Sequence, residues 1–198
     1  MVGIVFVKGG AMKKKIIIPA SLFLLGLISS ATIHAQNRGS STSFKKGSVS
    51  FNAGIGSGTE YKSDYYNAGL GTKGALEFGL WQAGPGVISL GIEAGASFSN
   101  GGYYYNDYKT STVVVAGRSA WHHGWNVRNL DTYAGLSAGI GFHQYRYSNN
   151  GKIKQDEVIP VFGGFIGASY FITPSFGLNI EAGYDITQIQ GGIIIKLK

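Results

Sequence analysis

The chain has 198 residues, enough for one domain, with 32 glycines, 13% aromatic residues and only 14% charged residues. So little charge beside so much glycine and tyrosine does not suit a surface in water, and the lack of cysteine excludes disulfides, thiolate metal sites and a lipoprotein anchor. The formal charge of +7 includes four lysines of the N-terminal segment, and 17 − 4 leaves 13 basic against 10 acidic residues, or +3. The remaining basic residues are scattered, so nucleic acid is not an expected partner.

The N-terminal segment has the order of a secretory signal peptide. From Met12, three lysines precede an apolar run and then small residues, which predicts a signal peptide over 12–35 with cleavage after Ala35. A transmembrane anchor is the alternative, but the run is shorter than the roughly 20 residues that a spanning helix needs, and Pro19 interrupts it. Residues 1–11 precede the basic region, and we expect them to reflect a misassigned upstream start.

A polar segment then leads into the domain. Residues 36–46 predict a flexible lead-in, and one domain is expected over 47–198. The first strand is expected at about 48–56, where Phe51 and Ile55 share an apolar face. A polar, tyrosine-rich stretch follows it.

The stretch 72–98 carries the clearest strand pattern. It reads TKGALEFGLWQ, then AGPG, then VISLGIEAGASF. The odd positions are mostly glycine, alanine and serine with an occasional charge, whereas the even positions are apolar: Leu76, Phe78, Leu80, Ile88, Leu90 and Ile92. Alternation with period two predicts two strands, and the Gly-Pro-Gly break predicts a tight turn between them.

Five more strands continue the pattern. They are expected at about 112–121, 130–143, 159–171, 177–185 and 191–197, with a ragged start of the third of these at Pro160. The connections after the first, third and fifth strands are long and polar, whereas those after the second, fourth and sixth are short. Eight strands, with polar loops expected at 100–111 and 144–157, therefore follow the signal peptide.

The inner face distinguishes a membrane barrel from a soluble sandwich. A solvent-facing sheet surface is normally rich in lysine, glutamate and threonine, whereas the non-apolar face here is glycine, alanine and serine with about one charge per strand. The lumen of an eight-stranded barrel is only wide enough for side chains to fill it. Long loops alternating with short turns are typical of membrane barrels. The fold class is therefore all-β, an eight-stranded antiparallel up-and-down transmembrane β-barrel.

Charges of both signs fall on the predicted inner face. An unpaired charge in a buried site is strongly destabilising, by about 3–5 kcal/mol when one partner is removed. We therefore expect a lumenal charge network formed by Lys73, Glu77, Glu93, Arg118, Glu181 and Lys196.

The combined features resemble a known family. The signal peptide, the eight strands, NLDTYAGLSAGIGF at 129–142 and the closing GGFIGASYFITPSFGLNIEAGYDITQIQGGIIIKL at 163–197 resemble the small bacterial outer-membrane β-barrel family of the OmpA-transmembrane or OmpX type, within the porin superfamily. The resemblance covers the mature chain and implies insertion into the outer membrane by the barrel-assembly machinery. The chain departs from the family in ending on Leu197-Lys198 rather than on an aromatic residue.

Other candidate sites have plainer explanations. His122 and His123 are adjacent, so on a strand they point to opposite faces, and a turn with interfacial aromatic residues is favoured over a metal pair. His143 lies near the outer end of its strand without the serine partner that outer-membrane lipid enzymes use. Tyrosines in the expected outer loops could form a recognition surface, with an interfacial girdle as the favoured alternative: Tyr65, Tyr66, Tyr103, Tyr104 and Tyr105.

These patterns predict an integral outer-membrane protein without catalysis, cofactor or metal. Its expected role is structural or in surface interaction within the cell envelope; the alternatives are an outer-membrane enzyme acting on lipid or peptide, and a narrow channel. An open pore is not expected at eight strands. The expected partners are outer-membrane lipid, the barrel-assembly machinery and an extracellular ligand bound through the long loops, and we expect a monomer.

Overall fold

The computed structural model describes residues 44–61, 67–103, 106–125, 127, 129–149 and 151–198. Within this part the chain forms eight strands: β1 (Val49–Gly58), β2 (Asn67–Ala83), β3 (Gly86–Tyr103), β4 (Asn106–Gly124), β5 (Leu130–Asn149), β6 (Gly151–Phe171), β7 (Phe176–Tyr184) and β8 (Thr187–Lys196). The predicted signal peptide at 12–35, the segment 1–11 and residues 36–43 lie outside the described residues. No helix in the described part is long and apolar enough to cross a membrane, a finding that concerns helices alone.

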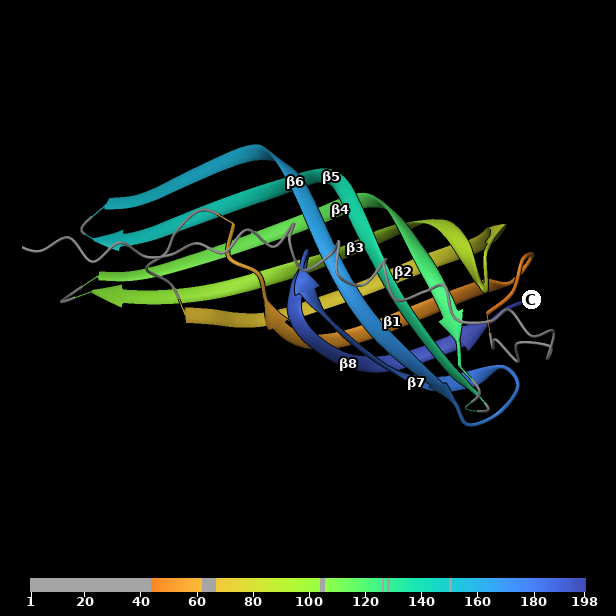
Figure 1. The fold of residues 1–198 in the computed structure, drawn as a ribbon. Coiled ribbons are helices and arrows are strands. Elements are labelled where there is room, and N and C mark those ends of the chain that lie inside the picture. The colour runs from red at the N-terminus through yellow and green to blue at the C-terminus, as the bar shows by residue number, and fades with distance from the viewer. Residues whose placement is uncertain (1–43, 62–66, 104–105, 126, 128, 150) are drawn as a thin grey trace, which may run out of the picture. The chain divides into compact units, whose positions relative to one another are not determined.

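The strands close into a barrel. Each strand pairs antiparallel with the next, and β8 returns to pair with β1. This closing seam runs from Ser50↔Lys196 to Gly58↔Thr187, and Figure 1 shows the two strands side by side. The prediction of an eight-stranded antiparallel up-and-down barrel is confirmed. Closure pairs the backbone groups that would otherwise form a sheet edge.

The two faces of the strands meet opposite environments. In the hairpin of β2 and β3, Lys73, Glu77 and Glu93 are buried at 1–2% exposure, whereas Phe78 and Ile92 point outward. The outward-facing large apolar side chains on the other strands include Phe51, Val115, Leu136, Ile140, Phe162, Ile166, Ile180 and Ile193. The barrel is therefore apolar outside and polar within, the reverse of a soluble domain.

Two hairpins continue beyond the closed ring and form a four-strand extension. Residues 100–109 pair across β3 and β4, and residues 144–157 pair across β5 and β6. The prediction of polar loops at 100–111 and 144–157 is wrong: the described residues of both segments continue the strand ladders. The polar sequence does not prevent pairing, because backbone ladders form without an apolar face when the neighbouring strand supplies the register.

β6 passes through Pro160 without interruption, contrary to the predicted ragged start. Pro160 pairs in register with Ile140 of β5, while β7 joins β6 only from Gly164 onward. Proline lacks a backbone N–H, so it is tolerated where one side of the strand needs no ladder hydrogen bond. Among the described residues, no strand pairs with that side of β6 from Val158 to Gly163.

The opposite end of the barrel carries the short connections and is called the turn end. The β2–β3 turn consists of Gly84 and Pro85, and Gly84 adopts φ 59°, a left-handed conformation in which glycine is unstrained. The tight turn predicted at 83–86 is confirmed. The connection predicted over 122–129 is shorter than expected, because β4 continues to Gly124.

Residues 44–48 fold back into the turn end. Phe44 is fully buried, and Gly47 donates its N–H to the carbonyl oxygen of Gly79 at 2.7 Å. Of the segment expected as a flexible lead-in over 36–46, the described residues 44–46 thus place one aromatic side chain inside the barrel.

Candidate functional site in the barrel lumen

Strand register places the central charges in one row across the sheet. Glu77 of β2 is opposite Gly91 of β3, Gly91 is opposite Arg118 of β4, and Arg118 is opposite Ser137 of β5. A Cβ on Gly91 would lie 3.1 Å from the Glu77 side chain and closer still to the backbone of β2. The glycine between them therefore lets side chains from β2 and β4 meet over the intervening strand.

Arg118 is the centre of the ion-pair set. Its Nη2 lies 3.1 Å from Glu77 Oε1 and 3.0 Å from Glu181 Oε2, and its Nη1 lies 3.0 Å from Glu93 Oε2. The guanidinium also stacks over the ring of Phe165, with Cζ 3.9 Å from the ring centroid. All of these side chains are almost fully buried. A guanidinium suits this position because its planar fork presents several donors in fixed directions.

Lys73 extends the set toward β7. Its Nζ pairs with Glu181 and lies 2.5 Å from Asp185 Oδ2. Asp185 follows the end of β7, and its other oxygen accepts the backbone N–H of Thr187 at 3.0 Å. The structure thus brings together five of the six residues expected in the lumenal network, and it adds Asp185, which sequence reasoning had placed only at the end of a strand.

Lys196, the sixth expected residue, lies nearer the turn end. Its Nζ is 5.1 Å from the ring centroid of Phe171, and it interacts electrostatically with Asp131. Lys196 is opposite Ser50 and Ser50 is opposite Glu77, so Lys196 lies two strands from Glu77, on the side away from Arg118.

His122 forms a second polar layer that sequence reasoning missed. Its Nδ1 lies 2.8 Å from Asp131 Oδ2 and its Nε2 lies 3.0 Å from Glu77 Oε2. The assignment of His122 to a turn is wrong, because it lies within β4 and points into the lumen. The alternation that buries Arg118 also buries the residue four positions later, and this periodicity was the available signal. No group of three or more His, Cys, Asp or Glu side chains that could hold a metal ion occurs among the described residues.

Ser89, His122 and Asp131 form the contact chain of a hydrolytic triad. Ser89 Oγ is 3.3 Å from His122 Nε2, and Asp131 accepts at the other ring nitrogen. The arrangement is not that of an activated nucleophile, however, because Ser89 donates to Glu77 Oε2 at 2.6 Å and the same carboxylate oxygen contacts Nε2. Ser89 is also fully buried. A competent base would accept the serine proton and face a substrate cavity.

Tyr133 connects the layers. Its hydroxyl donates to Glu181 Oε2 at 2.8 Å and accepts from Asn179 Nδ2 at 2.7 Å. Its ring covers Gly167 of the adjacent strand, where a Cβ would lie 2.3 Å from the ring. Phe165 packs edge-on against the ring, with centroids 6.1 Å apart.

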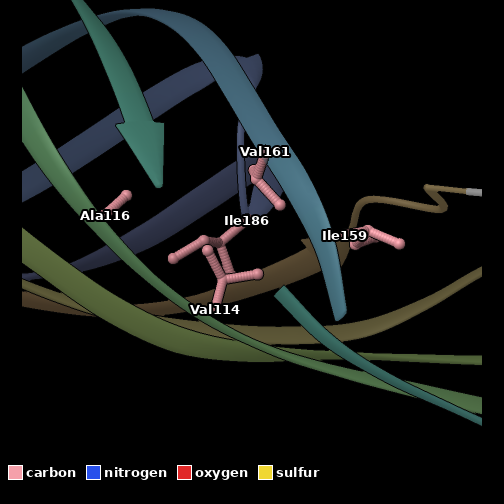
Figure 2. Close-up of a cluster of buried hydrophobic side chains, with 5 residues drawn as sticks. All are labelled: Val114, Ala116, Ile159, Val161 and Ile186. Atoms are coloured by element: carbon pink, nitrogen blue, oxygen red, sulfur yellow. The ribbon is translucent and has the colours of Figure 1, made fainter. Parts of the chain in front are cut away.

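Apolar side chains cover the charged layers at both ends. At the turn end, Phe44 stacks on His122 with ring centroids 4.0 Å apart. Toward the extension lies a buried cluster of Val114, Ala116, Ile159, Val161 and Ile186, against which Tyr61 packs. Figure 2 shows these side chains inside the ring of strands, with Ile186 beside Val114.

Tyr61 ties the apolar cover to the charged layer. Burial, followed by the nearby carboxylate of Asp185, raises the pKa of Tyr61. The phenol therefore stays protonated and donates to the carbonyl oxygen of Asp185 at 2.5 Å. The connection that contains Tyr61 is held further by Ser97, whose hydroxyl donates to the carbonyl oxygen of Thr59 at 2.6 Å.

The remaining predicted positions lie toward the extension. His143 is buried, with Nδ1 2.8 Å from Thr112 Oγ1. Tyr103 ends β3 in register with Asn106. Tyr65, Tyr66, Tyr104 and Tyr105 lie outside the described residues.

Comparison with known proteins finds likeness at the level of structure only. No protein-family model and no curated protein matches the chain. The attachment invasion locus protein Ail of Yersinia pestis, in complex with the heparin analogue sucrose octasulfate, is similar with a TM-score of 0.39 and 14% identity, over 75% of this chain and 93% of that one. A second structure of Ail is similar with a TM-score of 0.37, 15% identity and the same coverage. Similarity at this level carries no functional information.

Proposed function

We propose that the protein is an integral β-barrel of the bacterial outer membrane, without catalysis, that serves the cell envelope as a structural or surface-interaction protein. The turn end faces the periplasm and the extension faces the exterior. The expected signal peptide supplies the export that this location requires.

The observation that carries this proposal is the inversion of the barrel. Large apolar side chains point outward, such as Leu136 at 72% exposure and Phe162 at 71%, while Arg118 and its carboxylates are buried. In water this exposed apolar surface would be unfavourable at roughly 25 cal/mol per Å². In a bilayer it is solvated by acyl chains, and closure of the sheet between β8 and β1 removes the long unpaired edges of an open sheet.

The filled lumen argues against a channel. Arg118 and Lys73 are held by carboxylates at the centre, Phe44 covers one side, and the Ile186 cluster covers the other. Conduction would require these layers to separate, and removing one partner of a buried ion pair costs about 3–5 kcal/mol. The lumen therefore serves as the core of the protein.

The extension is the element suited to a surface role. It presents four paired strands beyond the ring, and the side of β6 away from β5 has no partner strand among the described residues from Gly151 to Gly163. An edge of this kind can bind an extended peptide through backbone hydrogen bonds. We therefore place surface interaction at the extension rather than in the lumen.

Membrane fractionation with gel mobility tests the location. Unheated protein from the outer-membrane fraction should run as a compact band that shifts on boiling. In intact cells, trypsin should cleave after the exposed Lys109 or Arg146 of the extension and leave the belt of strands intact. Recovery in the soluble periplasm would contradict the proposal, and cleavage only after cell lysis would reverse the orientation.

Fluorophosphonate labelling tests the absence of catalysis. This probe reacts with activated serines, so Ser89 should remain unlabelled in the folded barrel because its proton is donated to Glu77. The Ser89→Ala variant is the matched control. Labelling of the wild-type protein that disappears in this variant would support the enzyme alternative.

A further inference from the structure

The lumen holds more carboxylates than cations. Among the described residues, the buried permanent cations are two, Lys73 and Arg118, against five carboxylates: Glu77, Glu93, Asp131, Glu181 and Asp185. His122, which contacts a carboxylate through each ring nitrogen, supplies a third positive charge when both nitrogens donate. Lys196, which interacts electrostatically with Asp131, supplies a fourth. Four positive charges against five carboxylates leave one negative charge uncompensated.

The contacts single out the carboxylate that carries this excess. Glu77 accepts from Arg118, His122 and Ser89, and Glu181 accepts from Arg118 and two further donors. Asp185 is held by Lys73 and a backbone N–H. Glu77 and Glu181 therefore each accept from several donors, and Asp185 has a contact on each of its two oxygens.

Glu93 differs from the other carboxylates. Its Oε2 contacts Arg118 Nη1, and the same guanidinium also contacts Glu77 and Glu181 through Nη2. Its Oε1 has no hydrogen-bond partner among the described residues, and the side chain is 1% exposed. Asp131 also has an oxygen without a partner, but it faces His122, which it shares with Glu77, and it interacts with Lys196.

The charged and polar groups around Glu93 come from several strands and from one connection. Arg118 of β4, Lys73 of β2 and Asp185 after β7 interact with it electrostatically. The hydroxyl of Ser137 of β5 is near enough to interact with its carboxyl group, and Tyr61 approaches from the β1–β2 connection. Ser137 Oγ is likewise without a hydrogen-bond partner in the described part of the chain. A hydroxyl oxygen can accept a hydrogen bond from a carboxylic acid, but it cannot compensate a full negative charge.

We infer that Glu93 is a proton-binding site of the lumen. It carries a proton on Oε1 at neutral pH and directs this proton toward the Ser137 hydroxyl, while Oε2 accepts from Arg118. The proton brings the charged layer to neutrality. A buried unpaired charge would otherwise be strongly unfavourable, and neutralising the group is the usual way that a protein avoids it.

A stability contribution follows with a defined sign. A carboxyl group that the fold holds protonated stabilises the barrel at pH values where the proton is bound, and this contribution is lost as the pH rises and the buried group must ionise. The wild-type barrel should therefore become less stable toward alkaline pH. Glu93→Gln, which keeps the shape and has no proton to lose, should show a smaller loss.

The test compares two glutamate-to-glutamine variants of the full-length mature protein, each refolded into bilayers. At neutral pH, Glu93→Gln should leave the unfolding midpoint, measured by heated gel mobility, unchanged or raised. Glu181→Gln removes an anion that serves both Lys73 and Arg118, and it should lower the midpoint by roughly 10 °C. A fall in Glu93→Gln as large as in Glu181→Gln, or its failure to fold, would overturn the inference.

Infrared spectroscopy gives an independent readout. The wild-type barrel should show the carbonyl stretch of a protonated carboxylic acid, absent from Glu93→Gln and retained in Glu77→Gln. Persistence of the band in Glu93→Gln would place the proton elsewhere and overturn the inference. A wild-type midpoint that rises with added sodium or magnesium, with the rise absent from Glu93→Gln, would mean that a metal cation, not a proton, neutralises the site.

Discussion

The closed belt, in which every strand has two neighbours, and the extension share four strands, yet their sequences follow different rules. In the belt, β4 alternates strictly, with Val113 and Val115 outside and Val114 and Arg118 inside. In and beside the extension the same strand reads NDYKTS over residues 106–111, without the apolar alternation of the belt. Strands pair in both regions. The alternation of apolar and polar residues therefore indicates the environment of each face of a strand and not whether a strand forms.

This comparison locates stability in the belt and its lumen. The belt has a packed interior with buried charges, whereas the described part of the extension gains mainly from backbone pairing. Substitutions should therefore have large effects in the lumen, intermediate effects on the outer face of the belt, and small effects in the extension.

Arg118→Leu should have the largest effect. It leaves Glu77, Glu93 and Glu181 without their shared cation, and we expect the free energy of unfolding to fall by about 3–5 kcal/mol. Urea titration of the refolded barrel, followed by gel mobility, measures this change. Arg118→Lys keeps the charge but loses the planar fork, so its loss should be smaller. An unchanged midpoint in Arg118→Leu would mean that the ion-pair set is solvated.

Phe44→Ala tests whether the segment before β1 belongs to the belt. The side chain is fully buried on His122, and truncation of such a phenylalanine costs about 3 kcal/mol or more. The same urea titration measures the loss. Lys45→Ala, at the exposed neighbouring residue, is the control and should change stability little. Equal effects in the two variants would show that Phe44 does not pack in the lumen.

Val115→Arg tests the outer face against the extension on one strand. Val115 is 49% exposed on the apolar face, and an arginine at this depth should cost about 2–4 kcal/mol in a bilayer. Ser111→Arg lies on the same face of β4 about 13 Å closer to the tip, at roughly 3.3 Å per residue, and should cost less than about 1 kcal/mol. Similar costs for both would contradict the membrane assignment.

Tyr133→Phe should have a smaller effect on the lumen. The variant keeps the ring over Gly167 but loses the hydrogen bonds to Glu181 and Asn179, at a cost of about 1–3 kcal/mol. Thermal unfolding of the refolded protein is a suitable measurement. Tyr170→Phe, on the exposed face, should be nearly neutral. Neutrality of both would indicate that the Tyr133 hydroxyl is not a bonded member of the network.

Arg146→Leu should have the smallest effect. This arginine is exposed in the extension, and surface substitutions usually change stability by within about 0.5 kcal/mol. Both this variant and Arg118→Leu replace an arginine by leucine, so urea titration of the two variants compares the extension with the lumen directly. A loss in Arg146→Leu that approaches the loss in Arg118→Leu would show that the extension contributes to the packed core.

The sequence by itself determined the barrel and its two faces. Period-two alternation of apolar residues with glycine, serine and single charges defines eight strands and predicts which side chains lie inside, because successive residues of a strand point to opposite faces. It also identified Arg118 and the three glutamates as lumenal. These properties depend only on local spacing.

Only the tertiary structure decided which groups meet and where the strands end. Arg118 reaches Glu77 because register places Gly91 between them, and Asp131 reaches His122 because β4 and β5 are neighbours. The entry of Phe44 and Ile186 into the lumen, and the continuation of β3 to β6 beyond the ring, depend on space left by side chains distant in sequence. Such contacts depend on strand register and on closure of the sheet, and no local pattern encodes them.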